Sequence, residues 1–361
     1  MRILFAAGGT GGHINPALAI AKKFRENHPS CEILFVGTKR GLEGKLVPRE
    51  GFNLEFIEAV GFKRKLTPQN LVVAYKAFTS MLHTRKILKT FSPDLVIGCG
   101  GYTSGPVVLE AALKKIPTLI HEQNAFPGVS NKMLAGKADT VCISFEDTQS
   151  YFKKSKNVVF SGNPVRPALF SITKEKARKA LGIDERPLIV AVGGSLGATT
   201  INEQMLQLIQ NLPKNLQVIW ATGNREYEEI MQKIGTVPEN ATVSAYIYNM
   251  EQLLPAADLV ISRSGAITIA ELCATGTPSV LIPSPHVAEN HQEVNARALE
   301  ARNAAVVICE RELEEGLLSR KVKQLINSPE TLSDMSKNAC SMAKPDALDI
   351  IYNEGMKLIS K

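Results

Sequence analysis

Short runs of hydrophobic residues alternate along the chain with segments whose apolar positions recur at helical spacing. Runs that are apolar throughout are typical of parallel strands buried on both faces of a sheet. In the first half they predict strands at residues 3–7, 33–36, 54–57, 95–97, 118–120, 140–143 and 158–160. In the second half they predict strands at 188–192, 218–220, 243–245, 259–261, 280–282 and 306–308.

Helices fit between these strands, for example at 16–25 with proline at the start and at 201–212. The alternation predicts an α/β fold, and the proline-rich segment 162–167 separates two doubly wound, Rossmann-like domains. We expect a first domain at 1–163 and a second at 164–343. We expect residues 344–361 to form a helix that packs back on the first domain.

Composition is that of a folded globular protein: of 361 residues, 44 % are hydrophobic and 21 % charged. No apolar run reaches the ~18 residues of a transmembrane helix, and the first residues lack a signal-peptide pattern, so we expect a cytosolic protein. The six cysteines are dispersed, which argues against a zinc site and a disulfide framework.

Charge is unevenly distributed: the net charge is +7, with +10 on residues 1–163 and −3 on the remainder. Such an excess of Lys and Arg indicates an anionic partner for the first half, such as a membrane surface, a phosphorylated substrate or a nucleic acid. Nucleic acid is disfavoured, because the basic residues are not interleaved with stacking aromatics.

Two matching glycine-rich turns, residues 8–13 and 193–198, each follow a predicted strand and precede a predicted helix. Glycine lets backbone N–H groups approach a phosphate closely, and the helix N-terminus adds partial positive charge. Neither a complete dinucleotide fingerprint nor a Walker lysine motif is present, which disfavours NAD and ATP. Tight turns without a ligand are the alternative interpretation.

Six motifs occur in order along nearly the whole chain: GGTGGHINP at 8–16, GGYTSGP at 100–106, HEQN at 121–124, GNPVR at 162–166, GGSLGA at 193–198 and SRSGAITIAE at 262–271. Together they resemble the motifs of the MurG family of peptidoglycan glycosyltransferases. The resemblance implies a GT-B architecture, with two Rossmann-like domains facing a deep cleft. It also implies an inverting enzyme that transfers N-acetylglucosamine (GlcNAc) from UDP-GlcNAc to the 4-hydroxyl of the muramyl sugar of lipid I, which gives lipid II.

The resemblance places the UDP-GlcNAc donor mainly on the second domain. It implies diphosphate contacts from Ser195 and Arg166, a backbone contact of Ile247 with uracil, and a ribose contact from Glu271. Gln292 is similar to the residue that binds the sugar hydroxyls. The helix N-terminus beside the phosphates comprises Ala266, Ile267, Thr268, Ile269 and Ala270. Taken alone, Glu271 is better explained as a first-turn acid that favours the helix dipole, and Arg166 is also consistent with a solvated interdomain arginine.

On the first domain the resemblance places Thr10, Gly11, Gly12 and Asn124 around the transferred sugar. A general base must remove the proton of the acceptor hydroxyl. His13 is the first candidate because imidazole titrates near neutrality, and Glu122 is the competing base. Helix capping by His13 is the structural alternative.

No D-x-D motif is present, so we expect no metal ion and no cofactor, with Arg166 and helix dipoles offsetting the diphosphate charge.

One predicted helix combines an apolar stripe, Leu71, Tyr75, Phe78 and Leu82, with nearby basic residues at 63–65, 76, 85, 86 and 89. This pattern favours docking on an anionic membrane, and the family's lipid-linked acceptor indicates the cytoplasmic face. A stripe of this kind is also consistent with the core face of an ordinary crossover helix.

Two other functions remain open. A UDP-GlcNAc 2-epimerase shares this fold and donor, but its acid/base carboxylates are not evident here. A basic binding module for membranes or nucleic acid is compatible with the charge alone.

Overall fold

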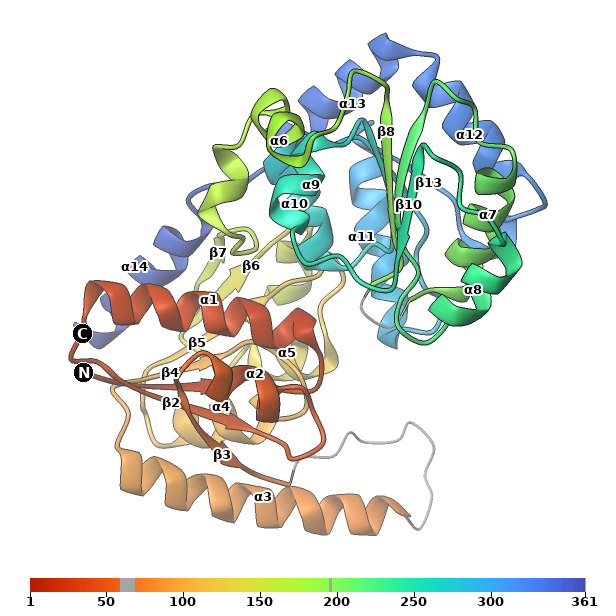
Figure 1. Cartoon of the computed structure of the whole chain (residues 1–361). Coiled ribbons are helices and arrows are strands. Elements are labelled where there is room, and N and C mark those ends of the chain that lie inside the picture. Colours follow the sequence, from red (N-terminus) through yellow and green to blue (C-terminus); the bar gives the residue numbers. More distant parts are fainter. Residues whose placement is uncertain (59–68, 195–196, 361) are drawn as a thin grey trace. The chain divides into compact units, whose positions relative to one another are not determined.

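The computed structural model describes residues 1–58, 69–194 and 197–360, and for residues 69–78 it describes the backbone alone. The chain divides into two compact units (Figure 1). Unit 1 comprises Met1–Val165 and Asp346–Lys361, and unit 2 comprises Arg166–Pro345. These boundaries lie two residues from those expected from the sequence.

Unit 1 is built on a seven-stranded, wholly parallel sheet in the order β3-β2-β1-β4-β5-β6-β7. Its strands are β1 (Arg2–Ala6), β2 (Glu32–Gly37), β3 (Asn53–Phe56), β4 (Leu95–Gly98), β5 (Thr118–Glu122), β6 (Thr140–Ile143) and β7 (Val158–Phe160). The order reverses between β1 and β4, and ligands of such sheets bind beyond the carboxyl ends of the strands at this reversal.

Helices cover both faces of this sheet (Figure 1). They are α1 (Gly11–Asn27), α2 (Glu43–Arg49), α3 (Gln69–Phe91), α4 (Ser104–Leu113), α5 (Val129–Leu134), η1 (Glu146–Phe152) and α14 (Ala347–Ile359). Successive residues of β1 point to opposite faces. Ile3 and Phe5 pack in a core with α1, α2 and α14, whereas Leu4 and Ala6 pack in a core with α3, α4 and α5.

Unit 2 repeats the plan with a six-stranded parallel sheet in the order β10-β9-β8-β11-β12-β13. Its strands are β8 (Leu188–Val192), β9 (Gln217–Ala221), β10 (Ala241–Ser244), β11 (Leu259–Ser262), β12 (Ser279–Leu281) and β13 (Ala305–Val307). If β8 is numbered as the first strand of its sheet, the six strands follow the order 3-2-1-4-5-6, which is also the order of the first six strands of unit 1. The sequence prediction of two doubly wound domains is confirmed.

The helices of unit 2 are η2 (Pro167–Phe170), α6 (Lys174–Leu181), α7 (Thr199–Gln210), α8 (Tyr227–Ile234), α9 (Met250–Ala256), α10 (Ala266–Thr275), η3 (Ala288–Asn290), α11 (His291–Glu300), η4 (Glu310–Glu312), α12 (Leu317–Ile326) and α13 (Pro329–Ser341). Its core includes the chain's one tryptophan, Trp220, which is fully buried and donates a hydrogen bond to Asn202 Oδ1 (3.1 Å). Burying an indole requires such an acceptor for its N–H.

Helix α1 begins earlier than the sequence predicts. Proline was expected at its first position, but the helix begins at Gly11, and Pro16 lies inside it. The carbonyl of Thr10 accepts from the amides of both His13 (3.1 Å) and Ile14 (3.2 Å), which closes the first turn before the proline. His13 therefore lies in the first helical turn and not in the preceding loop.

Helix α14 packs on α1 within unit 1. Ile351 and Leu358 are buried in the same core as Phe24, and the Phe24 and Tyr352 rings lie 5.0 Å apart. His28 Nε2 is hydrogen-bonded to the Tyr352 hydroxyl (2.9 Å). The last helix is therefore a structural part of the first domain.

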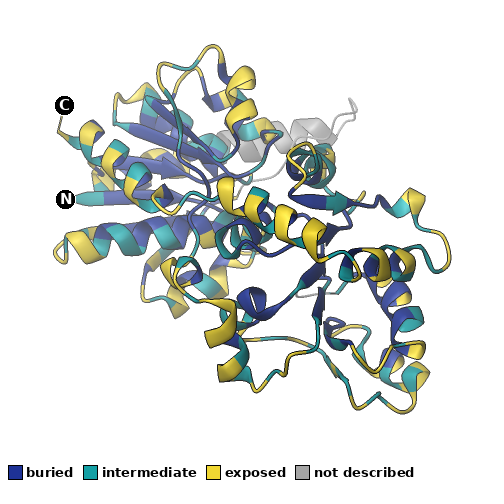
Figure 2. Ribbon diagram, turned by 90° about the horizontal axis from the view of Figure 1, so that it is seen from above, coloured by how far each residue is buried: buried dark blue, intermediate teal, exposed yellow. Residues whose placement is uncertain are grey.

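Burial follows this layered plan (Figure 2), with the strands largely buried and the outer helix faces exposed. Among the residues that the structure describes, no helix has the length and hydropathy needed to cross a membrane.

Candidate functional site

The first glycine loop lies in unit 1 between β1 and α1, against the loop that follows β4. Gly101 has φ +78°, and a Cβ at this position would lie 2.3 Å from the carbonyl oxygen of Gly8. The backbones of the two loops therefore approach each other more closely than any side chain permits. Ser104 fixes the second loop, because its hydroxyl accepts from Gly100 N (3.0 Å) and lies 2.7 Å from Ala6 O.

A buried carboxylate also holds the first loop. Glu43 accepts from the backbone of Gly9 (3.0 Å) and of Thr38 (2.7 Å), and its side chain is fully buried. Because two backbone amides converge on this one buried side chain, Glu43 fixes the loop geometry. The loop is thus rigidly supported in the structure.

His13 is positioned by both neighbouring loops. Its Nδ1 lies 3.2 Å from Gln123 Oε1, and a Cβ on Gly100 would lie 2.8 Å from the same nitrogen. Gly100 also has φ +96°. Glycine is therefore favoured at this position both by its backbone conformation and by the lack of space for a side chain. His13 is only partly buried, which leaves its ring accessible to a substrate.

Glu122, the competing base, is almost completely buried and has donors on both oxygens. Oε1 accepts from Asn124 N (3.0 Å) and Asn124 Nδ2 (3.2 Å), and Oε2 accepts from Gly128 N (3.0 Å) and Asn131 Nδ2 (2.9 Å). A carboxylate saturated by four donors has no free lone pair directed at a substrate. The geometry gives Glu122 a structural part in the loop after β5 and favours His13 as the base.

The remaining first-domain candidates surround the start of α1 or lie close to Glu122. Thr10 and Gly12 are exposed and Gly11 is partly exposed at the helix N-terminus. Asn124 is partly exposed after β5. Backbone amides at this helix end supply partial positive charge that favours an anion or an electronegative oxygen.

The second glycine loop follows β8 in unit 2. Gly197 has φ +82°, and a Cβ there would lie 2.2 Å from Thr222 O, so this loop too requires glycine. Ser195 lies outside the described residues. Gly197 N donates to Gly194 O (3.0 Å), which closes the turn.

Arg166 and Glu271 lie together in unit 2. Arg166 Nη2 is 3.6 Å from Glu271 Oε1, and its Nη1 donates to Glu251 Oε2 (2.7 Å). Burial raises the pKa of Glu271, and the charge of Arg166 counteracts part of that rise. Arg166 is half exposed, so its guanidinium can also reach an anionic ligand.

The N-termini of α10 and α11 are tied together. The hydroxyl of Ser264 donates to Gln292 O (2.8 Å), and Gln292 Oε1 accepts from Ser284 N (2.9 Å). The positions expected near the phosphates begin helix α10, where the Ile269 amide bonds to Gly265 O. The structure thus brings Gln292 beside the loop that precedes α10.

Ile247 lies in the loop between β10 and α9, partly exposed. The rings of its neighbours Tyr246 and Tyr248 meet edge to face, with centroids 4.7 Å apart.

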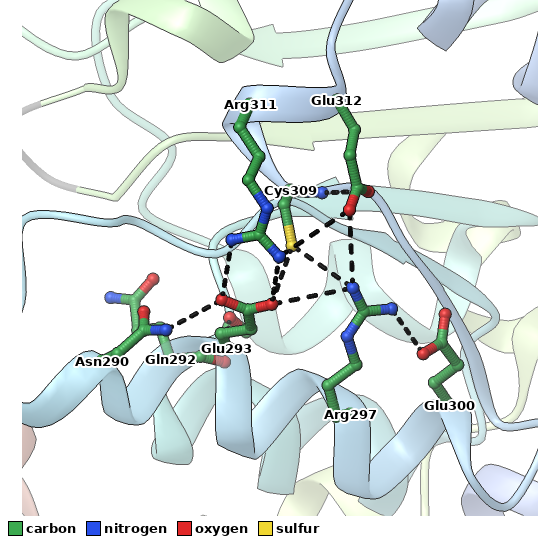
Figure 3. Close-up of polar contacts among 9 residues, drawn as sticks. Asn290, Gln292, Glu293, Arg297, Glu300, Cys309, Arg311 and Glu312 are labelled. Atoms are coloured by element: carbon green, nitrogen blue, oxygen red, sulfur yellow. Dashed lines mark hydrogen bonds and ion pairs between the residues drawn. The ribbon is translucent and has the colours of Figure 1, made fainter.

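An ion-pair network fixes α11 to the segment that follows β13 (Figure 3). Both oxygens of Glu293 pair with Arg311 (2.8 and 3.2 Å), and Glu293 also accepts from Asn290 Nδ2 (2.8 Å) and the Cys309 thiol (3.2 Å). Arg311 above all lowers the pKa of Glu293 to about 2, whereas burial and the same carboxylate raise the pKa of Cys309 to about 11. The network anchors the helix that carries Gln292.

The described part of α3 bears on the membrane hypothesis. Its buried face is formed by Ser80, Thr84, Ile87 and Leu88, whereas Leu82 lies on the opposite side and is 46 % exposed. Leu82 therefore does not belong to the core face of a crossover helix. The side chains of Leu71, Tyr75 and Phe78, and residues 63–65, lie outside what the structure describes.

Comparison with known proteins gives the family. Residues 3–143 match the glycosyltransferase family 28 N-terminal domain, and residues 188–351 match the glycosyltransferase family 28 C-terminal domain. A curated relative from Thermoanaerobacter sp. (strain X514) is 50 % identical over 98 % of both chains. The chain belongs to glycosyltransferase family 28.

The relative from Thermoanaerobacter carries the name "UDP-N-acetylglucosamine--N-acetylmuramyl-(pentapeptide) pyrophosphoryl-undecaprenol N-acetylglucosamine transferase", as does one from Clostridioides difficile that is 43 % identical over 99 % of this chain and 89 % of its own length. The crystal structure of MurG from Acinetobacter baumannii superimposes with a TM-score of 0.82 at 30 % identity, covering 99 % of each chain. The predicted resemblance to the MurG family and the GT-B fold are confirmed.

Two residues in this family 28 site have no role in the sequence analysis. Glu43 supports the first glycine loop by accepting from Gly9 N, and Gln123 supports His13 through its contact with the ring. Gln123 lies within the HEQN motif, but only the fold shows that it faces a residue 110 positions away. Glu43 begins α2 in the segment after β2 and belongs to no motif, so the sequence offers no signal for it.

Among the described residues, no group of three or more His, Cys, Asp and Glu side chains could hold a metal ion.

Proposed function

We propose that this glycosyltransferase moves GlcNAc from UDP-GlcNAc to the 4-hydroxyl of the N-acetylmuramyl-pentapeptide of undecaprenyl-pyrophosphate-linked lipid I, forming lipid II with a β-1,4 linkage for peptidoglycan synthesis. The observation that carries the proposal is the 50 % identity, over 98 % of the chain, to a relative bearing the name of that activity. The placement of His13 in the first turn of α1, directly after the first glycine loop, supports it.

The reaction needs one base and a stabilised leaving group. We assign the base to His13: it accepts the proton of the acceptor hydroxyl as the hydroxyl oxygen forms a bond to the anomeric carbon. The bond from that carbon to the UDP oxygen breaks, so UDP leaves with the bonding electrons and the configuration inverts. General-base assistance of this kind contributes roughly 10²- to 10⁴-fold in rate.

The donor is assigned to unit 2. Arg166, the second glycine loop with Ser195, and the start of α10 are assigned to the diphosphate, where amides and a guanidinium offset the negative charge. Glu271 is assigned to the ribose hydroxyls, the backbone of Ile247 to uracil and Gln292 to the sugar. Thr10, Gly11, Gly12 and Asn124 of unit 1 are assigned to the transferred sugar.

We propose that no metal ion or cofactor is required, because the chain lacks a D-x-D motif and Arg166 is available to the diphosphate. The enzyme is assigned to the cytoplasmic face of the membrane as a peripheral protein. Exposed Leu82, together with exposed Lys86 and Lys89 on α3, supports docking on an anionic surface.

The test is transfer of radiolabel from UDP-GlcNAc to a soluble lipid I analogue, with chromatographic identification of the disaccharide product. The expected result is a β-linked disaccharide and an equal amount of UDP, unchanged by a chelator. UDP-N-acetylmannosamine formed without acceptor would instead identify an epimerase. Absence of both products would contradict the proposed function.

A further inference from the structure

The side chain of Gln123 lies between two histidines in unit 1 and is almost completely buried. Its Oε1 is 3.2 Å from His13 Nδ1, and its Nε2 is 3.0 Å from His121 Nδ1. The Gln123 side chain therefore links a partly exposed histidine at the start of α1 to a fully buried one in β5.

The neighbouring carbonyls fix which way the Gln123 amide points. Nε2 lies 3.1 Å from Cys99 O and 3.1 Å from His121 O, and both of these atoms can only accept hydrogen bonds. If the amide were rotated by half a turn, its oxygen would face two carbonyl oxygens in a buried site. The NH₂ group must therefore face these carbonyls, and the oxygen must face His13.

His121 agrees with this orientation. The NH₂ group of Gln123 also faces His121 Nδ1, which must therefore be unprotonated, and the ring proton then belongs on Nε2. Nε2 lies 3.1 Å from Gly162 O, which accepts it. Burial lowers the pKa of His121 to about 4, so the ring is neutral at the pH of a working cell.

The same reasoning determines which ring nitrogen of His13 carries the proton. An imidazole nitrogen that faces the Gln123 oxygen must carry a proton, since two acceptors in contact repel each other. In the neutral ring the other nitrogen, Nε2, is then left with its lone pair. A general base needs that lone pair directed at the proton it removes.

We infer that Gln123 is a positioning residue that holds neutral His13 in the Nδ1-protonated tautomer, so that Nε2 is the atom that accepts the proton of the attacking hydroxyl. The tautomer follows from the hydrogen bonds of unit 1 alone, whereas its catalytic use rests on the proposed function. A triad carboxylate orients a catalytic histidine in the same way, but here a neutral amide does so and adds no charge.

The tautomer can be measured directly in the unaltered protein. In ¹⁵N-labelled histidine spectra at pH 8, His13 is expected to show a pyrrole-like Nδ1 and a pyridine-like Nε2. The signals are assigned by their loss in His13→Ala, and they report the tautomer whether or not the protein transfers GlcNAc. A His13 ring protonated on Nε2 would overturn the inference.

Gln123→Met tests the catalytic use, because methionine has similar volume and neither accepts nor donates as an amide does. We expect kcat to fall roughly 10- to 100-fold with little change in the KM for UDP-GlcNAc, and the Nδ1-protonated tautomer to lose its predominance. Gln204→Met in α7 is the matched control, since Gln204 is also buried but makes one long contact, 3.5 Å to Glu314 O.

A double-mutant cycle separates positioning from support of the fold. If Gln123 acts through His13, adding Gln123→Met to His13→Ala lowers kcat no further. An equal additional loss in both backgrounds would overturn the positioning role. Should Gln123→Met fail to fold, the spectrum of the unaltered protein still decides the tautomer. If the unaltered protein shows no transfer, the proposed function fails while the tautomer result stands.

Discussion

The two glycine loops arise from the same strand order but differ in the side chains around them. In unit 1 the loop is fixed by buried Glu43 and leads into His13, whose ring is held by Gln123. In unit 2 the loop closes against the backbone of Thr222, and the described charged groups near the expected donor site, Arg166 and Glu271, come from other segments.

This difference indicates how one fold supports two tasks. The turn itself supplies backbone amides and a helix N-terminus in both units, which suits phosphate or sugar oxygens. Proton transfer needs a titratable side chain held in one orientation, and unit 1 provides it. Function in such folds therefore depends on the residues that line the turn.

The largest expected effect is that of His13→Ala. We expect kcat to fall by ~10² to 10⁴ with nearly unchanged donor affinity, because the base acts in the transition state and the UDP part of the donor is assigned to the other unit. The acidic limb of the pH profile should disappear with the imidazole. Steady-state kinetics and donor titration measure both quantities.

His28→Ala is the matched control, since His28 is in the same unit but is hydrogen-bonded to Tyr352. Full kcat in His13→Ala would reduce His13 to a packing residue held by Gln123 and remove the contrast between the two loops.

Glu122→Gln should affect stability more than chemistry. An amide in place of the carboxylate directs an NH₂ group at backbone and side-chain donors, and we expect a loss of about 2–4 kcal/mol in the free energy of unfolding. The variant should keep the acidic limb of the pH profile. Denaturant unfolding and the pH dependence of kcat test this, and loss of that limb in a stable variant would assign the base to Glu122.

Gly101→Ala tests the close approach of the loops in unit 1. We expect destabilisation by about 2–3 kcal/mol, because the new methyl group would meet the Gly8 carbonyl and φ is positive. Gly9→Ala is the control: its φ is +92°, but nothing lies within 4 Å of the added Cβ, so only about 1 kcal/mol is expected. Thermal unfolding of the two variants compares them.

Unit 2 offers the same comparison between a crowded glycine and an open one. Gly197→Ala would meet Thr222 O, whereas Gly194→Ala, with φ +90°, has open space. Equal Tm values for the crowded and the open variants, in either unit, would show that the backbone contact is unimportant.

Glu271→Ala should weaken UDP-GlcNAc binding by ~1.5 to 3 kcal/mol, because a carboxylate that accepts from hydroxyl groups is lost. Glu251→Ala is the control, since it also removes a partner of Arg166 but is not assigned to the ribose. Calorimetry on both variants gives the difference in their free energies of UDP-GlcNAc binding. An unchanged donor affinity in Glu271→Ala would contradict the ribose assignment.

The smallest effect concerns the network around Glu293. Its folded-state pKa of about 2 lies below the ordinary value of a glutamate, so its stabilising contribution is present above about pH 4.5 and is lost as the pH falls toward 2. Because the side chain is 18 % exposed, we expect only about 1–2 kcal/mol. Glu293→Gln should reduce the acid dependence of unfolding between these pH values, and an unchanged dependence would contradict the assignment.

The sequence predicts most of the scaffold. Fully apolar runs locate the strands, because burial on both faces leaves no polar alternation, and residues 140–143 and 188–192 match β6 and β8 to the residue. The predicted start of α1 was wrong. Hydrogen bonds from the His13 and Ile14 amides to the Thr10 carbonyl begin the helix before Pro16, despite the preference of proline for the first turn.

The candidate site could be predicted only in part. The sequence favours His13 as the base but leaves Glu122 as a competing candidate, and the four donors around Glu122 provide the structural distinction. Gln123 and Glu43 act across long sequence separations, and such contacts exist only once the sheet has formed. Polar neighbours of this kind leave no periodic signal in a chain.

Because α14 packs on unit 1, the two units complete their cores at different times during synthesis. A ribosome completes residues 166–345 before it reaches Ile351 and Leu358, so unit 2 can fold as one continuous segment while unit 1 still lacks part of its core. Until then, the apolar surface of Phe24 has no partner from α14. Nascent unit 1 is therefore the portion that exposes hydrophobic surface longest and has most need of a chaperone.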